Sequence, residues 1–561
     1  MTAKASEVPM PKFVSLEGSQ RTLLPNSTLV GPVDPNEMAS LIVRVRSLGS
    51  REELERLVQE TAKTQLSERT YLSREELATR YGADPADLDA VEQYASRHNL
   101  TVVDRNQQSR SVIVRGRISD LLQAFPANIR IYQHASGTYR GRTGEIQIPP
   151  ELAGLVVGII GFDTRRKRRA SSRVRVSALD GPGGDNGEAP TYFANRYSFP
   201  TQYQGRKLDG TGQSIAIIEL GGGYRVADLQ IYFDEISIPL PKITQVSVDN
   251  VTNSPTQEGG DDDEVALDIE IIGACAPGAN IFVYFAPNQG DAGFLDPIRA
   301  AVHDQERSID VISISSGGPE PASAGGQELS AYHDLFIDAA ALGITVCVAS
   351  GDHGVADLPA NQWDKVIHVD HPAVDPYVLA CGGTQISNGV DVLCNDGNPF
   401  DTNSRDGGGW ASGGGISVSY DVPDYQLNAG LPDSLVRGRP GRGVPDIAMS
   451  ATNYFVRVDS VEYAGGGTSA VAPLMSALIA VINQATQKNV GFINPFLYSN
   501  PGTLTDVVKG DNGIANTIVG YAANKGWDAC TGLETPNGTA ILNTLQATSE
   551  KRRLGSCRLS V

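Results

Sequence analysis

Hydrophobic and polar positions in the first third of the chain follow two repeating patterns. Short apolar or alternating runs predict strands, and amphipathic runs between them predict helices. The predicted strands are Leu41–Val45, Leu100–Val103 and Ser111–Val114, and the predicted helices are Arg51–Gln59, Ser73–Tyr81 and Asp87–His98. This mixture, which extends from Ser40 to about Asp163, indicates an α+β module.

The pattern changes in the rest of the chain, where the predicted strands are continuously apolar. These strands are 214–218, 281–285, 311–315 and 344–349, and helical patterns lie between them at 263–273, 294–304 and 328–342. Such an order predicts an α/β domain, with a parallel sheet covered by helices on both faces. Because ligands bind at the carboxyl ends of parallel strands, candidate site residues should follow these strands directly.

A charged and turn-rich segment separates the two patterns. Arg165-Arg-Lys-Arg-Arg-Ala-Ser-Ser is followed by Gly181-Pro-Gly-Gly-Asp-Asn-Gly, with no apolar period. These features predict an exposed linker of the kind that proteases cut. We therefore divide the chain into an N-terminal module (1–164), a cleavable linker (165–188), an α/β domain (189–548) and a tail (549–561) to which the sequence assigns no role.

Composition and charge narrow the class of protein. The 561 residues, 40% of them hydrophobic and 92 of them Gly or Pro, suit a loop-rich globular protein of several domains. Residues 1–190 carry 26 Lys+Arg and 23 Asp+Glu, whereas residues 191–561 carry 20 and 42. The acidic second part repels phosphate backbones, which argues against a nucleic-acid partner. Its carboxylates serve either solubility or adaptation to acid.

Membrane, export and cysteine signals are all weak. The longest apolar stretch, Leu152–Phe162, is far shorter than the roughly 20 residues that span a bilayer, so we expect no membrane partner. Met1–Lys12 has no apolar core of an ordinary signal peptide. The six cysteines form no CxxC pair, which predicts neither a disulfide framework nor a zinc site.

Polar, glycine-rich segments follow three of the predicted strands. They are Glu219-Leu-Gly-Gly-Gly, Ser315-Ser-Gly-Gly-Pro and Ser350-Gly-Asp352-His-Gly. A fourth segment, Gly465-Gly-Gly-Thr-Ser469-Ala-Val-Ala-Pro, opens an amphipathic helix over Ser469–Gln484, whose free N–H groups suit an oxyanion. In isolation, a serine at this position would be interpreted as a helix N-cap.

Glu264 and Asp268 lie four residues apart on the predicted helix 263–273, so their carboxylates share one face. An isolated pair at this spacing is more often part of a solvated face. Here the preceding run Asp261–Asp263 already supplies a solvated end, which favours a chemical role for the pair.

The four motifs together resemble those of one peptidase family. Gly-Thr-Ser469-Ala-x-Ala-Pro, Glu264-x-x-x-Asp268, Ser-Gly-Asp352-x-Gly and a strand ending in Glu219-Leu-Gly-Gly-Gly look like the sedolisins, the serine-carboxyl peptidases, and most closely the kumamolisins. The N-terminal module, with Thr138-Tyr-Arg-Gly-Arg-Thr-Gly, is similar to the kumamolisin pro-domain. The resemblance implies a subtilisin-like parallel sheet preceded by an α+β, ferredoxin-like pro-domain.

The resemblance also implies catalytic roles. Ser469 would be the nucleophile, Glu264 its general base, Asp268 the carboxylate that supports Glu264, and Asp352 the acid of the oxyanion hole. A histidine with a pKa near 6.5 is protonated in acid, whereas a glutamate with a pKa near about 4.3 still accepts a proton. A neutral carboxylic acid can donate a hydrogen bond to the oxyanion. Subtilisins share the serine turn, but none of the seven histidines lies in their His-Gly-Thr setting, so we interpret His353 as a wall or loop residue.

Two further sites follow from the same resemblance. Glu219 would be a supporting outer acid, although its family partner, a Trp, is replaced here by Ser316. Ser412, Gly413 and Gly414 resemble the substrate-binding edge, where glycines let a peptide backbone approach; a plain glycine-rich turn is the alternative.

A calcium site is implied near the C-terminus. The carboxylates of Asp506 and Asp528 and the backbone carbonyls of Val507, Asn524 and Gly526 would hold one Ca²⁺, which prefers oxygen ligands.

The sequence thus predicts an acid-acting serine endopeptidase made as a zymogen. Its substrates would be proteins or peptides, its own pro-domain would be its intramolecular inhibitor, and the resemblance implies an extracellular location. Two alternatives stay open at this point: an aminopeptidase of the tripeptidyl-peptidase kind, and a non-catalytic protein that keeps the fold, which Ser316 and the missing export signal would suit.

Overall fold

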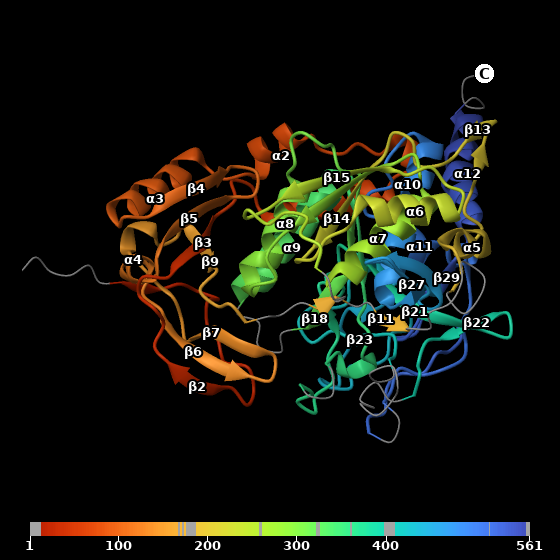
Figure 1. Cartoon of the computed structure of the whole chain (residues 1–561). Coiled ribbons are helices and arrows are strands. Elements are labelled where there is room, and N and C mark those ends of the chain that lie inside the picture. Colours follow the sequence, from red (N-terminus) through yellow and green to blue (C-terminus); the bar gives the residue numbers. More distant parts are fainter. Residues whose placement is uncertain are drawn as a thin grey trace, which may run out of the picture.

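The computed structural model describes residues 13–165, 169–170, 173–175, 187–256, 261–320, 326–358, 362–397, 410–514 and 517–556, with the backbone alone at 169–170, 173–175, 291 and 548–556. The chain forms an N-terminal α+β module and a larger α/β domain that lie side by side (Figure 1). Parts of the predicted linker and tail, including Arg166–Arg168 and Cys557, lie outside the described residues.

An antiparallel sheet with the strand order β4-β5-β3-β9 forms the centre of the N-terminal module. Its elements are β3 (Met38–Val45), α1 (Arg51–Lys63), α2 (Arg74–Tyr81), α3 (Pro85–Arg97), β4 (Thr101–Asn106), β5 (Ser111–Arg117), α4 (Ile118–Ala124) and β9 (Val156–Ile160). This is the βαββαβ arrangement of a ferredoxin-like fold, which confirms the predicted fold class. A second sheet, β2 (Thr28–Gly31), β6 (Asn128–His134) and β7 (Gly137–Thr143), was not predicted.

Both faces of the module's central sheet are buried. Leu41 and Val43 of β3 pack in the module's own core, whereas Ile42 between them packs with apolar residues of the larger domain. Successive side chains of a strand point to opposite faces, so one face of the sheet packs in the module's own core and the other packs at the contact between the two units. On the far side of this contact are helices α8 (Gly290–Val302) and α9 (Gly326–Ala341).

The larger domain is built on an eight-stranded sheet with the order β15-β16-β14-β17-β19-β21-β22, in which β25 also pairs with β21. The strands are β14 (Ser214–Glu219), β15 (Lys242–Ser247), β16 (Asn280–Phe285), β17 (Val311–Ile314), β19 (Thr345–Ala349), β21 (Leu379–Ser387), β22 (Val390–Leu393) and β25 (Ile447–Ser450). All pairs are parallel except β21 with β22. The four predicted strands are β14, β16, β17 and β19, so the predicted parallel sheet is confirmed.

Helices cover both faces of this sheet, as predicted. Helices α7 (Asp261–Cys275) and α10 (Val471–Thr486) pack together on one face, and α8 and α9 lie on the other. The segment Thr468–Thr486 is long and apolar enough to cross a membrane by length and composition, but 94% of its most apolar window is buried inside the protein, as in the core helix of a globular domain. Five cysteines among the described residues are free: Cys275, Cys347, Cys381, Cys394 and Cys530.

The linker and the larger domain also contain shorter elements and further helices. They include β10 (Arg169–Ala170), β11 (Arg173–Arg175), α5 (Pro190–Arg196), α6 (Val226–Glu235), β18 (Ser316–Pro319), β20 (Asp370–His371), β26 (Tyr454–Val458), β27 (Val461–Gly466), the 3-10 turn Thr468–Ala470, α11 (Asn494–Ser499) and α12 (Gly538–Ser556). The backbone of α12 runs through the boundary that we placed between the domain and the tail.

Candidate active site

Ser469 lies in the 3-10 turn Thr468–Ala470, which leads directly into α10. The turn starts at Gly467, whose φ of 123° is in the region that favours glycine. Ser469 is fully buried, and its Oγ donates a hydrogen bond to the carbonyl oxygen of Ser315 at 3.0 Å. The serine predicted as a nucleophile therefore faces the carboxyl end of β17.

Glu264 and Asp268 are one turn apart on α7, and their exposed fractions are 2% and 0%. This burial rules out the solvated face that the isolated spacing favours. The Oγ of Ser315 donates to both carboxylate oxygens of Asp268, at 2.9 and 2.7 Å. Burial raises the pKa of Asp268 well above its usual range, and the Ser315 hydrogen bond opposes this rise.

Ser315 is a site residue to which the sequence analysis assigned no role. Its hydroxyl orients Asp268, and its carbonyl oxygen accepts from Ser469, so one residue connects the carboxylate to the nucleophile. Its place directly after a buried strand was the only signal in the sequence.

Asp352 follows β19 and is 3% exposed. Its Oδ1 accepts hydrogen bonds from the backbone N–H of Thr468 at 2.8 Å and from the Thr468 hydroxyl at 2.9 Å. The same hydroxyl accepts from the Gly351 N–H at 3.1 Å. Thr468 therefore fixes the Asp352 loop directly beside Ser469, and the structure brings all four predicted catalytic residues to one edge of the sheet.

Two short strands of the linker, β10 and β11, lie at this edge of the sheet, and β11 lies beside β27 in Figure 1. Arg169 and Ala170 of β10 pair antiparallel with Gly317 and Ser316 of β18. Further along, β11 pairs antiparallel with residues 464–466 of β27, just before the nucleophile. The two strands approach the cluster from both sides, which is how a peptide substrate would add a strand to the edges of a cleft.

Comparison with known proteins identifies the family of this chain. The family model described as "Pro-kumamolisin, activation domain" matches residues 25–165, and the model described as "Subtilase family" matches residues 256–500. Kumamolisin from Bacillus sp. (strain MN-32) is 40% identical over 547 residues, which are 94% of this chain and 96% of that protein. The chain belongs to the sedolisin family of serine-carboxyl peptidases.

More distant members of the family match over similar lengths. Sedolisin from Pseudomonas sp. (strain 101) is 26% identical over 88% of this chain and 85% of that protein, and tripeptidyl-peptidase sed5 from Aspergillus fumigatus is 26% identical over 95% and 97%. The solved structure of Pseudomonas sedolisin, complexed with two molecules of pseudo-iodotyrostatin, matches with a TM-score of 0.54 at 28% identity and covers 65% of this chain and 99% of that chain. The protein is thus a serine-carboxyl peptidase with an activation domain.

Glu219 places a third carboxyl group in the peptidase's cluster. It ends β14 and is 2% exposed. Burial raises the pKa of Glu219 well above its usual range, and the nearby charges of Asp268 and Glu264 raise it further, so the neutral acid is favoured. Its Oε1 has no hydrogen-bond partner among the described residues. Ser316, which replaces the family's Trp, pairs instead with Ala170 through its backbone.

The residues predicted as a substrate edge occupy a supporting position. Ser412 accepts from the Gly383 N–H at 2.8 Å, and the Gly413 N–H donates to the Gly351 carbonyl oxygen at 2.7 Å. A Cβ on Gly413 would lie 2.0 Å from the Ser350 carbonyl oxygen, and one on Gly414 would lie 2.4 Å from the Ala529 carbonyl oxygen. These glycines let the chain pack against its own Asp352 loop, whereas β18 and β27 are the segments that pair with the extended linker. A role of residues 412–414 toward substrate stays a prediction.

His353 lies in the same loop and pairs through its backbone with Ala411. The carboxyl groups of the buried cluster come from α7 and β14, whereas His353 lies in the loop after β19. We therefore keep the interpretation of His353 as a loop residue.

The predicted calcium ligands Asp506 and Asp528 both accept hydrogen bonds from backbone N–H groups of residues 524–531. The Asp528 carboxylate accepts from the Asn524 N–H at 2.8 Å, and the Asp506 carboxylate accepts from the Gly526 N–H at 3.3 Å. The N–H groups of Cys530 and Thr531 also donate to Asp528, at 2.9 and 2.8 Å. Burial raises the pKa of Asp528, and these N–H donors oppose the rise. Two oriented carboxylates beside a carbonyl-rich loop are a donor set that fits a hard cation.

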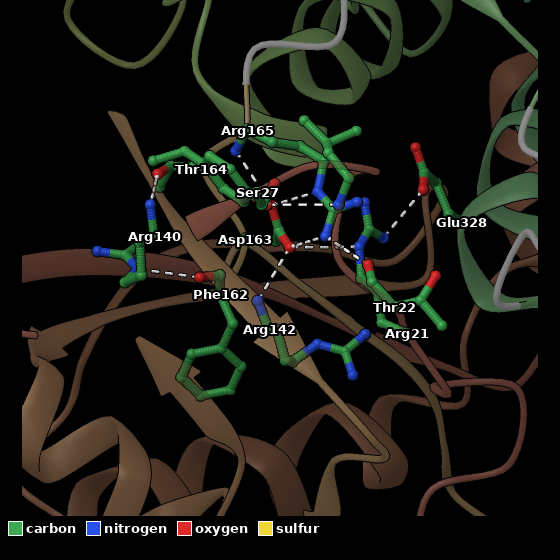
Figure 2. Close-up of polar contacts among 12 residues, drawn as sticks. Arg21, Thr22, Ser27, Arg140, Arg142, Phe162, Asp163, Thr164, Arg165 and Glu328 are labelled. Carbon is green, nitrogen blue, oxygen red and sulfur yellow. Dashed lines mark hydrogen bonds and ion pairs between the residues drawn. The ribbon is translucent and has the colours of Figure 1, made fainter. Parts of the chain in front are cut away.

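A polar cluster holds the start of the linker (Figure 2). The carboxylate of Asp163 accepts from the guanidinium of Arg165 at 2.8 and 2.6 Å and from the Arg142 N–H at 3.1 Å. Arg21 lies 3.4 Å from Asp163 and donates to Glu328 of α9 at 3.1 Å. Asp163 thereby contacts β7 through Arg142 and the linker through Arg165, and Arg21 connects it to α9 of the catalytic domain.

Buried ion pairs join the two units elsewhere. Arg44 and Arg51 of the pro-domain both pair with Asp334 of α9, and Arg110 binds both carboxylate oxygens of Asp338 at 2.7 and 3.3 Å. Burial works against a charged Asp334, but Arg44, Arg110 and Arg51 together hold the pKa of Asp334 below its usual value of 3.8.

Proposed function

We propose that this serine-carboxyl peptidase is an endopeptidase that acts in acid, is made as a zymogen and removes its own pro-domain. The observation that carries the proposal is the linker, whose extended strands flank a buried serine and carboxyl cluster. An enzyme that releases tripeptides needs a cleft that is closed beyond the third residue. Here the linker continues from Arg169 back to the anchored Arg165, which favours an open cleft and internal cleavage.

The residues support an acyl-enzyme reaction. As the Ser469 hydroxyl attacks the substrate carbonyl carbon, Glu264 accepts its proton, and it then gives that proton to the leaving amine. Asp268, oriented by Ser315, supports Glu264. The Oδ1 of Asp352 accepts from the Thr468 N–H and hydroxyl, and a neutral Asp352 held in this way would donate its own proton in a hydrogen bond to the oxyanion. Water then hydrolyses the ester on Ser469 by the same steps in reverse.

Self-processing tests the proposal. The purified 561-residue protein is incubated at about pH 3–4, where a glutamate is still partly ionised, and the products are mapped by mass spectrometry. We expect the first cut between residues 170 and 173, because β10 and β11 end on either side of this segment. A chain that stays intact at every acid pH, or is cut only outside 165–188, would contradict the proposal.

We further propose that acid loosens the pro-domain by protonating interface carboxylates. Because the pKa of Asp334 is lowered in the folded protein, its contribution to docking is complete at neutral pH and is lost as the pH falls through that lowered pKa. His303, which is buried 3.4 Å from Asp338, acts in the same direction. Burial lowers the pKa of His303, so its protonation in acid adds a positive charge near Arg110.

Replacing Asp334 with Asn should release the pro-domain at a higher pH. The change leaves Arg44 and Arg51 without their carboxylate. The Arg51 side chain is 38% exposed, so most of the cost falls on Arg44, which is 6% exposed, and losing the partner of such a buried charge costs on the order of 3 kcal/mol. The measurement is the pH at which half of the chain has been processed in a fixed time. Asp424→Asn is the matched control, because it removes an exposed pair with Lys63 at the same interface and should shift this pH little. Equal midpoints for Asp334→Asn and the control would count against the acid release.

We propose one structural Ca²⁺ on Asp506, Asp528 and the backbone carbonyls of Val507, Asn524 and Gly526. The pre-oriented carboxylates described above support it. Removal of calcium with EDTA should lower the melting temperature of the processed enzyme by several degrees, and added Ca²⁺ should restore it. Asp506→Asn should abolish this difference, whereas Asp433→Asn, an exposed carboxylate outside the site, should keep it. A melting curve that EDTA leaves unchanged would argue against the ion.

A further inference from the structure

A pocket of about 380 Å³ lies beside the active site on the β27 side of the cleft. Its lining mixes aromatic and small polar residues: Glu188, Tyr192, Phe193, Gln385, Ile386, Trp410, Ser450, Thr452, Asn453, Ala464, Gly465 and Gly466. None of these residues takes part in the chemistry described above.

The pocket adjoins the catalytic residues at two points. Gly466 lies three residues before Ser469 in the chain. Trp410 precedes Ala411, whose N–H donates to the carbonyl oxygen of Asp352 at 3.2 Å. The pocket is therefore fixed to both the nucleophile turn and the Asp352 loop.

A peptide strand on β27 passes directly over this pocket. The residues of β11 pair one to one with Gly466, Gly465 and Ala464, and all three of these line the pocket. The pairing places the linker residue Val174 opposite Gly465.

The face of β27 that carries Gly465 points to the pocket's aromatic wall. Tyr454 of β26 lies opposite Gly465, and its ring stacks on Phe193 with centroids 4.0 Å apart. Phe193 in turn lines the pocket. Directly opposed residues in antiparallel strands have side chains on the same face, so a peptide residue opposite Gly465 lies on the face that carries Tyr454, whose ring contacts Phe193. Its two neighbours in the peptide point to the other face.

We infer that this pocket is a specificity subsite for a bulky aromatic side chain on the leaving-group side of the cleaved bond. The inference rests on the proposed function, because it concerns the substrate of the same active site. Trp410, Tyr192 and Phe193 supply the apolar surface that an aromatic ring packs against. The polar groups of Asn453 and Gln385 suit the hydroxyl or indole N–H of a tyrosine or tryptophan.

The wall of this subsite belongs to the catalytic domain itself. The Glu188 N–H donates to the Asn453 carbonyl oxygen at 2.8 Å, and the Glu188 carbonyl oxygen accepts from the Phe455 N–H at 2.9 Å. These bonds hold the segment that carries Tyr192 and Phe193 against β26. Because they lie after the expected cut between residues 170 and 173, the subsite is retained in the processed enzyme.

The test uses internally quenched peptides with the sequence of residues 168–177, carrying Val, Phe or Gly at the position of Val174. We expect kcat/KM to rise in the order Gly, Val, Phe, with roughly a tenfold or larger ratio between Phe and Gly. In Tyr192→Ala this ratio should fall severalfold. Tyr192 is 43% exposed, so its truncation leaves the core intact, and Leu427→Ala is the matched control, an exposed apolar residue outside the pocket.

Alternation along the peptide provides an internal control. In a further peptide, Phe replaces Arg175, which pairs with Ala464 and therefore lies on the other face. The rate of cleavage of this peptide should be the same for the unaltered enzyme and for Tyr192→Ala. Equal kcat/KM for the three residues at position 174, or a ratio that Tyr192→Ala leaves intact, would overturn the subsite. If no peptide is cut, with mass spectrometry confirming intact chains, the proposed peptidase function fails instead.

Discussion

Replacing Ser469 with Ala should leave the full-length chain intact at acid pH and reduce the cleavage of quenched peptides by about 10⁴-fold or more. The substitution removes the only atom that attacks the substrate in the proposed reaction, while the Asp352 loop and the linker strands keep their contacts. Because Ser469 is fully buried beside the linker, we expect the variant to fold as the zymogen does. The readouts are intact mass after incubation at about pH 3–4 and the initial rate with peptide.

Ser476→Ala is the matched control for this variant. It makes the same change on α10, the helix that follows the Ser469 turn, at a buried hydroxyl that has no hydrogen-bond partner among the described residues. It should process itself at the wild-type rate. If Ser469→Ala is also processed and active, Ser469 is not the nucleophile.

Glu264→Gln should have an effect of similar size, about 10³–10⁴-fold on kcat, because the amide has the shape of the carboxylic acid but cannot accept the serine proton. The pH profile separates this role from a structural one. Residual activity that rises above neutral pH, where hydroxide replaces the missing base, would fit a lost general base, whereas a loss of folding would flatten activity at every pH. Asp263→Asn, a carboxylate on the same helix that binds Tyr463 at 2.8 Å, is the control for the stability of α7. Unchanged activity in Glu264→Gln would exclude Glu264 as the base.

Local motifs allowed most of the catalytic cluster to be predicted. Glu219 ends a buried strand, Asp352 follows another, and Ser469 opens a helix. These three positions can be recognised without knowledge of the fold. Glu264 and Asp268 share a helix face for the same local reason. The role of Ser315 could not be predicted, because the carboxylate that its hydroxyl binds is 47 residues away in the sequence.

Other features depend on contacts that a sequence pattern does not encode. Gly413 and Gly414 lie against carbonyl groups of the protein itself, and the glycine motif alone could not distinguish this contact from the predicted approach of a substrate, which stays a prediction. Strand β15 was missed because it lies at the sheet edge, with polar residues such as Lys242 and Gln245 that weaken the apolar signal. The alternation in β3 predicted a strand, but not that Ile42 would pack on another domain.

One contact between the pro-domain and the catalytic domain does not titrate in acid. Arg69 donates to the carbonyl oxygens of Val490 and Ala62 at 2.6 and 2.8 Å, Tyr71 donates to that of Asn489 at 3.0 Å, and Lys488 donates to that of Ser67 at 2.6 Å. Their acceptors are backbone groups, so these hydrogen bonds do not titrate, whereas lowering the pH weakens the Asp334 end of the interface. Acid thus acts on only one part of the contact between the two units, and separation of the pro-domain must also break these hydrogen bonds to backbone carbonyl groups.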